Sequence, residues 1–138
     1  METKPVYKSF NSNKSLEELL YFITNDLQRL TELKIELQFY TILIDKPIFI
    51  KNVMNLFEKL SELKNDIIQL EKTRMKLLIK LKSHINLISN KIVCQDTVCD
   101  IFFIDAYNEV EKETFNFDKE ILNFKSRYYE YIQGVIIK

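Results

Sequence analysis

His84 is the only histidine of the chain, and Cys94 and Cys99 are the only cysteines. Zinc normally takes four ligands, and no further histidine or cysteine exists to complete such a site. A nucleophilic thiolate needs a nearby base, but the histidine lies on a different stretch from the cysteines. We therefore expect no metal site. We interpret the two thiols as buried or idle and His84 as a polar core residue that fixes helix register.

The other polar groups also lack a catalytic arrangement. Arg74 interrupts an apolar stripe, and we expect its guanidinium either to pair with a carboxylate across a helix seam or to extend to water. Glu17 and Glu18 fall on a predicted exposed face, where carboxylates are solvated. Gly134 is the sole glycine, so a glycine-rich phosphate loop is excluded. These residues predict no catalytic group, no cofactor and no enzymatic activity.

The composition is typical of long helices joined by few connections. Apolar residues make up 46% of the chain and charged residues 29%, which excludes disorder of the whole chain. One glycine and two prolines in 138 residues are too few for the many tight turns of a β-sandwich or barrel. The composition therefore predicts one all-α unit.

Charge and hydropathy exclude two classes of partner. Twenty basic residues balance twenty acidic ones, whereas nucleic-acid-binding proteins usually carry a basic excess, so we expect no nucleic-acid partner. Apolar runs such as residues 101–104 fall far short of the roughly 18 residues that span a bilayer, so we expect no membrane partner. The N-terminal stretch lacks an apolar signal region, and two cysteines do not suggest a disulfide scaffold. We expect a soluble, cytoplasmic protein.

The N-terminal part of the chain is predicted to contain a tail followed by a helix. Residues 1–14 are polar and aperiodic, which predicts a flexible tail before a single elongated helical unit over residues 15–138. Ser15 with Glu18 three positions later matches a capping box and predicts the start of a helix over about 15–44. The stripe of this helix comprises Leu16, Leu20, Ile23, Leu27, Leu30, Leu37 and Ile44, widened by Leu19, Leu33 and Tyr40.

A break is expected at Asp45-Lys46-Pro47. The residue before a proline is disfavoured in helical backbone, so the first helix should end here. Asp45 is a candidate cap for the next helix, with Pro47 in its first turn. The sequence does not decide whether the chain kinks or folds back here. A connection of about two or three residues would suit an antiparallel hairpin.

The second helix, over about 47–92, carries a long heptad stripe. Twelve consecutive heptad positions run from Phe49 to Ile88, and only Arg74 and His84 among them are polar. At 1.5 Å per residue the stripe is about 60 Å long, which does not fit a compact globule of this size. Lys64, Asp66, Glu71 and Thr73 flank its middle as in a two-helix seam, and apolar flanks near its ends suggest wider packing.

These features define the expected fold and part of the expected interface. The fold is an elongated all-α hairpin or coiled coil of about three long helices, bundle-like at its ends. Core-facing leucine and isoleucine side chains of the second helix are the expected contacts with partner helices. They are Leu56, Leu60, Leu63, Ile67, Leu70, Leu77 and Leu81.

A third helix is expected over about 97–133, with Asp96 or Thr97 as its cap. Its heptad alternation is aromatic, and large rings suit an interface in which they anchor into a companion surface. We expect Phe117, Phe124, Tyr128 and Tyr131 to bind a partner. The open alternative is that these rings form the core of the chain itself.

Residues 47–115 carry a suggestive order of features. The stretch "PIFIKNVMNLFEKLSELKNDIIQLEKTRMKLLIKL" is followed by "KIVCQDTVCDIFFIDAYNEVEKE", a loop and then a helix with aromatic residues near its start. This order resembles a small coiled-coil subunit of the augmin (HAUS) complex, although Thr97 and Val98 stand where that family usually has a Leu-Pro step. The resemblance implies a non-enzymatic subunit of an elongated hetero-oligomer on spindle microtubules, which recruits the γ-tubulin ring complex.

Two functions are therefore expected as alternatives. The first is a structural subunit of a hetero-oligomeric coiled-coil complex, augmin-like by resemblance, that supports microtubule-dependent microtubule nucleation in the mitotic spindle. Its partners would be other coiled-coil subunits, with microtubules or the γ-tubulin complex contacted indirectly. The second is a self-contained helical bundle, such as an adaptor, a homodimer, or a kinetochore, tethering or viral accessory protein. Only the second should fold cooperatively when alone.

Overall fold

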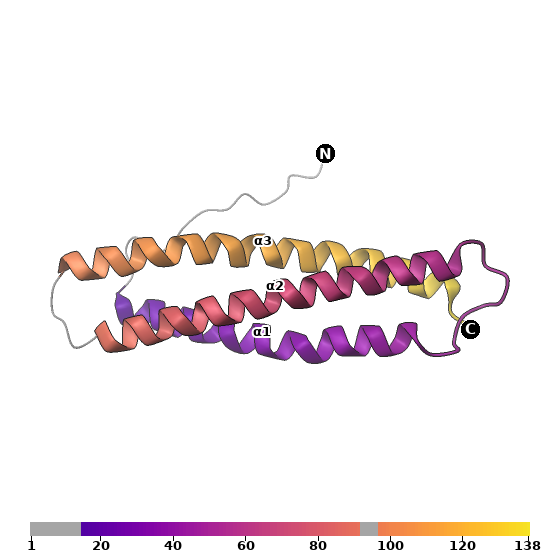
Figure 1. Cartoon of the computed structure of the whole chain (residues 1–138), viewed down its shortest axis with the longest axis horizontal. Helices are drawn as coiled ribbons and strands as arrows, with labels where there is room; N and C mark the ends of the chain where they lie inside the picture. The colour runs from indigo at the N-terminus through magenta and orange to yellow at the C-terminus, as the bar shows by residue number, and fades with distance from the viewer. Residues whose placement is uncertain (1–14, 92–96) are drawn as a thin grey trace.

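The computed structural model describes the backbone of residues 15–91 and 97–138, and the side chains of residues 15–90 and 103–138. It consists of α1 (Leu16–Ile44), α2 (Leu56–Lys91) and α3 (Thr97–Val135). The helices account for 87% of the described residues, whose only β pairing is one bridge between Phe49 and Ile136. Each helix runs antiparallel to the next along one long axis, giving an elongated three-helix bundle (Figure 1). The predicted all-α class is confirmed, while the predicted tail and Asp96 lie outside the described residues.

Helix α1 begins where the capping box predicts. The Glu18 backbone N–H donates to Ser15 Oγ at 3.2 Å, and the Ser15 hydroxyl donates to the Glu18 carboxylate at 3.4 Å. The Ser15 hydroxyl thus satisfies one of the first N–H groups, which have no partner within the helix. At the other end Asp45 is the C-cap, and its N–H donates to carbonyl groups of the last turn. Asp45 therefore ends α1 and does not cap the next helix.

The predicted start of the second helix at Pro47 is wrong, because residues 45–55 form an irregular connection and α2 begins at Leu56. The backbone of this connection pairs with the end of α3. Ile137 N–H donates to the Ile48 carbonyl, and Ile50 N–H donates to the Val135 carbonyl, both at 2.8 Å. Backbone groups in these bonds cannot also make the bonds of a helix. The chain folds back into a hairpin, but through a connection longer than expected.

Two asparagines of this connection have left-handed backbone conformations. The φ angle is 67° at Asn52 and 59° at Asn55. Asparagine tolerates this region better than most residues, and a helix does not continue through it. Phe49 and Val53, predicted as the first heptad positions, consequently lie before the helix. The remaining α2 has 36 residues and is about 54 Å long at 1.5 Å per residue.

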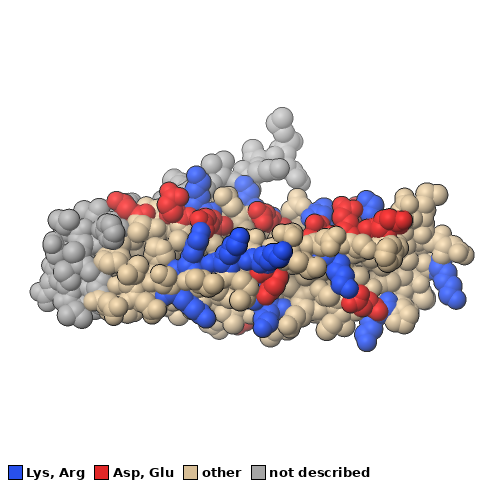
Figure 2. Space-filling view, in the orientation of Figure 1, with Lys and Arg blue, Asp and Glu red and all other residues tan. Residues whose placement is uncertain are grey.

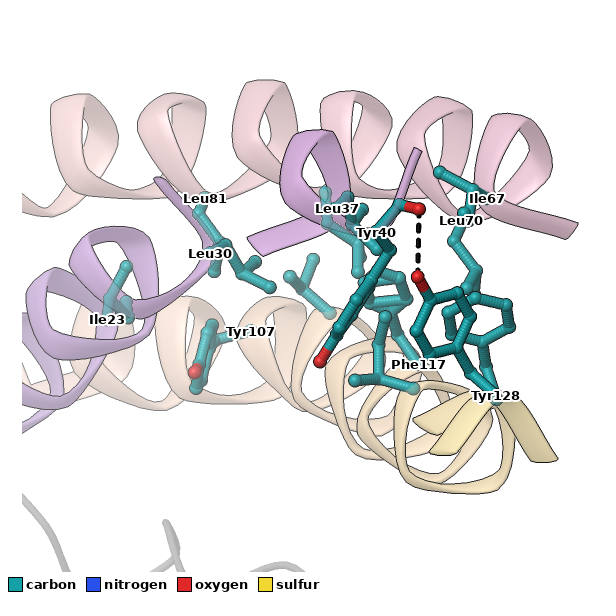
Figure 3. Close-up of a cluster of buried hydrophobic side chains, with 14 of the residues drawn as sticks. Ile23, Leu30, Leu37, Tyr40, Ile67, Leu70, Leu81, Tyr107, Phe117 and Tyr128 are labelled. Atoms are coloured by element: carbon teal, nitrogen blue, oxygen red, sulfur yellow. Dashed lines mark hydrogen bonds between the residues drawn. The ribbon is translucent and has the colours of Figure 1, made fainter. Parts of the chain in front are cut away.

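The core runs between the three helices along the length of the bundle. Each helix contributes the residues of its predicted stripe, including Leu30 and Leu37 from α1 and Leu81 from α2 (Figure 3). Helix α3 contributes rings, and Phe117 and Tyr128 are each only 1% exposed. The large Tyr128 ring packs on Tyr40 of α1, although the backbone of α3 lies closer to α2 than to α1.

Polar residues flank the core on both sides of α2. Lys64 Nζ lies 3.0 Å from an oxygen of Asp45, at the end of α1, whereas Asp66 lies 3.0 Å from Arg127 of α3. Lys80 pairs with Glu113 of α3 at 2.7 Å. The middle of α2 thus lies between two helices. The predicted two-helix seam is corrected: three-helix packing extends through the centre.

Candidate interaction surfaces

His84 and Tyr107 pack ring against ring between α2 and α3. The ring centroids are 5.9 Å apart, with the planes at 72°. The His84 Nδ1 atom is buried and has no hydrogen-bond partner among the described residues. Burial lowers the pKa of His84 below its ordinary value, since the desolvated ring disfavours positive charge. Within the described residues, no group of three or more His, Cys, Asp or Glu side chains is placed to hold a metal ion.

Arg74 is buried, with a guanidinium satisfied from two helices. Its Nε and Nη2 atoms donate to both carboxylate oxygens of Glu71, at 2.7 and 2.5 Å, and Nη1 donates to the Leu30 carbonyl of α1 at 3.2 Å. The side chain is 2% exposed, so it does not extend to water. The carboxylate partner belongs to the same helix, which corrects the expectation of a pair across the seam. The bond to Leu30 nonetheless ties α2 to α1 at one register.

Cys94 lies outside the described residues, and only the backbone of Cys99 is described, within α3. The expectation that both thiols are buried or idle therefore stays a prediction.

A cluster of tyrosines joins α1 to α3. Tyr40 contacts the rings of Phe124, Tyr128 and Tyr129, with the Tyr128 centroid 4.6 Å away. Its hydroxyl donates to the Glu36 carboxylate, while the Tyr128 hydroxyl donates to the Tyr40 carbonyl at 2.9 Å (Figure 3). Burial raises the pKa of Tyr40, and the bond to Glu36 raises it further. Burial, with a smaller contribution from Tyr129, raises the pKa of Tyr128 to about 12. These hydroxyls stay protonated and hold helices together.

The predicted partner-binding residues turn out to form the core of the chain itself. Eight of them are buried within the single chain: Leu63, Ile67, Leu70, Leu77, Leu81, Phe117, Phe124 and Tyr128. The other three are half-buried: Leu56, Leu60 and Tyr131. The aromatic stripe faces α1 and α2, so the alternative left open by the sequence is the one observed. A partner would reach the eight buried side chains only if the bundle opened.

Large apolar side chains instead lie exposed on the outer faces, where the heptad analysis did not place contacts. On α1 these include Ile35 and Ile42, 70% and 53% exposed. On α2 they include Ile68, Met75 and Ile79, 46%, 48% and 66% exposed. The sequence could have indicated these exposed residues, because they are apolar but fall outside the core-facing heptad positions. A second apolar row on a helix that already has a core face points to a further contact.

Grooves run along both sides of α2, and two of them differ in their lining. The groove toward α3 has a volume of about 780 Å³, and its charged side chains include Asp66, Lys119, Glu120 and Arg127. Its charges are of both signs, and Arg127 pairs with Asp66. The groove toward α1 has a volume of about 520 Å³ and is lined by Leu37, Ile42, Ile67 and Ile68, with Lys34 and Lys72 among its polar residues. Neither groove contains a nucleophile beside a base, but the second offers apolar surface.

No described helix combines the length and the hydropathy needed to cross a membrane. Comparison of the chain with models of known protein families, with curated proteins and with solved structures gave no match.

Proposed function

We propose that the chain is a non-enzymatic, self-contained helical bundle that binds other proteins through its outer faces. The observation that supports this proposal is that the core closes within one chain while large apolar side chains stay exposed outside it. A closed core gives the bundle stability of its own. Surplus apolar surface is typical of proteins that bind partners.

The closed core distinguishes this proposal from the obligate-subunit alternative. An obligate subunit would present core-forming stripes that only another chain could cover. Here the stripe residues Leu63, Leu77 and Phe117 are already covered by neighbouring helices of the same chain. The adaptor-like alternative from the sequence is therefore the better supported of the two.

The augmin-type role is a narrower, second candidate. It is supported by the order of features over residues 47–115, a long heptad helix followed by a helix rich in aromatic residues. It is weakened because residues 47–55, which belong to the resembling stretch, are not helical. This candidate places the protein on the spindle in the cytoplasm of dividing cells. Tagged chain from mitotic cells should then co-purify γ-tubulin, and failure to recover γ-tubulin would exclude it.

Behaviour of the purified chain tests the main proposal. We expect a monodisperse monomer by light scattering, with one cooperative thermal transition by circular dichroism. Its midpoint should be independent of protein concentration, because no subunit dissociates on unfolding. An aggregated chain, or one without a transition until another protein is added, would mean that it is an obligate subunit.

The binding part of the proposal needs a second experiment. Cross-linking in the native cell, followed by mass spectrometry, should place cross-links on lysines of the outer faces, for example Lys72 and Lys112, both exposed. Heat-unfolded chain, added to a lysate of the same cells and cross-linked there, is the control. It shows which proteins are cross-linked only because core residues are exposed. Cross-linked proteins shared completely with this control would contradict an interaction role.

A further inference from the structure

Charge is divided unevenly among the three helices, although the chain as a whole is neutral. Helix α2 contains eight lysine or arginine residues and four aspartate or glutamate residues, whereas α3 contains four basic and eight acidic ones. Helix α1 contains two basic and five acidic residues. Figure 2 shows basic side chains gathered along the middle of the face that α2 presents and acidic side chains along the edge formed by α3. The central helix therefore carries a basic surface between two acidic neighbours.

The basic surface is concentrated in the second half of α2. Between Ile67 and Asn90 the only carboxylate is Glu71, and it is held by the buried Arg74. Lys80 pairs with Glu113 of α3. The remaining lysines of this stretch, Lys72, Lys76 and Lys82, are exposed and make no ion pair with any described residue, and the same holds for Lys34 of α1. Their charge is not compensated within the described part of the chain.

The same face carries the exposed apolar row and the apolar groove. On α2, Ile68, Met75 and Ile79 are separated by seven and then four residues, so they lie on one side of the helix. Ile42 of α1 borders the groove from the other side, and Ile35 lies seven residues earlier on the same side of that helix. We call this surface the basic α1–α2 face. Its members are Ile35, Ile42, Ile68, Met75 and Ile79 with Lys34, Lys72 and Lys82. Lys76 instead lines a groove between α2 and α3.

We infer that the basic α1–α2 face docks an acidic amphipathic helix of another protein. A concave groove between two helices accepts the apolar stripe of a third, and the side chains that anchor such a helix recur every three or four residues. Acidic residues beside that stripe would meet Lys34, Lys72 and Lys82, giving complementary potentials across the interface. This inference rests on the proposed function and names the chemical class of its partner.

A second copy of the chain fits this face less well than an acidic helix. Two copies joined face to face would bring the uncompensated lysines of both close together, and like charges across an interface are unfavourable. The acidic residues of α3 lie on a different side of the bundle (Figure 2). The charge of the face therefore selects a partner of opposite sign.

A synthetic helix serves as the probe. It is a fluorescently labelled amphipathic peptide of about three heptads, with leucine at core positions and glutamate at the flanking positions. A matched peptide has lysine in place of each glutamate. We expect the full chain to bind the glutamate peptide, measured by fluorescence anisotropy, and to bind it more weakly as salt rises. The lysine peptide should bind at least about tenfold more weakly.

Variants of the chain identify the face. The triple variant Lys34→Glu, Lys72→Glu, Lys82→Glu should bind the glutamate peptide about tenfold more weakly and should bind the lysine peptide instead. The control variant Lys51→Glu, Lys112→Glu, Lys138→Glu changes net charge equally at exposed sites elsewhere and should bind like the original chain. Because the exchange of peptide preference requires folded protein, it separates loss of binding from loss of fold.

Apolar variants test the groove separately. Ile42→Gln with Ile68→Gln should weaken binding of the glutamate peptide, because both side chains line the groove and are 53% and 46% exposed. Leu122→Gln with Ile137→Gln, at sites 65% and 63% exposed on other surfaces, should leave binding unchanged. The control sites are more exposed than the groove sites, so a larger effect of the groove variant reports the position of the substitution.

Four outcomes would overturn the inference. The first two are equal binding of the two peptides and equal effects of the face and control variants. The third is lysine-dependent binding to phosphatidylserine vesicles with no binding to the glutamate peptide. The fourth is a dimer of the chain that Ile42→Gln with Ile68→Gln dissociates. Each presupposes a chain that folds alone, so none contradicts the proposed self-contained bundle. Conversely, an unfolded chain fails the proposed function before any peptide is added.

Discussion

Arg74 and His84 occupy core-facing heptad positions of the same helix, but their polar atoms have different surroundings. The Arg74 guanidinium bonds to Glu71 and to the Leu30 carbonyl, whereas the buried Nδ1 of His84 has no partner among the described residues. A buried cation is tolerated when its charge and N–H groups are matched, and a buried unpaired atom costs stability. We therefore expect the first residue to define the register and the second to make stability depend on pH.

We expect Glu71→Ala to destabilise the bundle more than Arg74→Met does, although Arg74 is the more buried residue. Removing the carboxylate leaves a buried guanidinium without its counter-charge, which costs about 3 kcal/mol. Methionine instead replaces the guanidinium with an apolar group of similar length, at a cost of about 1 kcal/mol or less. Urea unfolding of both variants measures the two free energies. The reverse order would show that Arg74 does not depend on Glu71.

Stability should fall as the pH decreases through about 6.5, the ordinary pKa of histidine. Burial lowers the pKa of His84 in the folded state, so the unfolded chain takes up its proton first. The contribution of neutral His84 is complete above the unfolded value and is lost between that value and the lower folded one. Urea midpoints between pH 7.5 and pH 5 should show this loss, and His84→Leu should remove it. An unchanged slope in His84→Leu would assign the loss to other groups.

At the scale of elements, α2 organises the bundle because it contacts α1 on one side and α3 on the other. Its core-facing residues, such as Leu63 and Leu77, are buried, while residues beside them form ion pairs at the two seams. Lys64 is 43% exposed in its side chain, and its partner Asp45 is 57% exposed. A buried apolar side chain therefore contributes much more to the free energy of unfolding than a solvent-screened ion pair at the next position.

Adjacent substitutions on α2 should consequently have unequal effects. Leu63→Asp places a carboxylate in a buried site and should prevent stable folding, with a loss of at least about 3 kcal/mol. Lys64→Asp removes an exposed ion pair with Asp45 and should cost about 1 kcal/mol or less. Circular dichroism during thermal unfolding compares the two. Similar losses from both would mean that the heptad register is misassigned.

At the scale of the whole molecule, α3 closes the core that α1 and α2 begin. Phe124 and Tyr128 pack on Tyr40 of α1, and the end of α3 pairs with the connection at Ile48 and Ile50. Removing α3 would therefore expose apolar surface on both other helices and release the backbone of the connection. The elongated shape does not make the helices independent.

Truncation after Asn116 tests this interdependence. The truncated chain loses Phe117, Phe124 and Tyr128 from the core, so we expect loss of cooperative unfolding and strong binding of a hydrophobic dye. A truncated protein that still unfolds cooperatively would show that α1 and α2 form a stable pair alone. Phe124→Leu is a milder control, which should destabilise the bundle without abolishing its transition.

The sequence by itself determined the helices and the face that each one buries. Helical periodicity and the cap at Ser15 are local signals, because the backbone bonds of a helix join residues four apart. The stripe from Leu63 to Ile88 and the aromatic stripe of α3 were predicted for this reason. The exposed apolar row through Ile68 and Ile79 was also visible in the sequence, but only the register of the core showed that it lies outside.

The tertiary structure decided what each stripe packs against and where α2 begins. Periodicity shows that a face is buried but not whether the same chain or another covers it, since both remove the same apolar area from water. Pro47 correctly ended α1, but the backbone of Ile48 and Ile50 takes partners at Val135 and Ile137, far away in the sequence. Those hydrogen bonds form only when α3 returns to this end of the bundle. Local propensity contains no information about them.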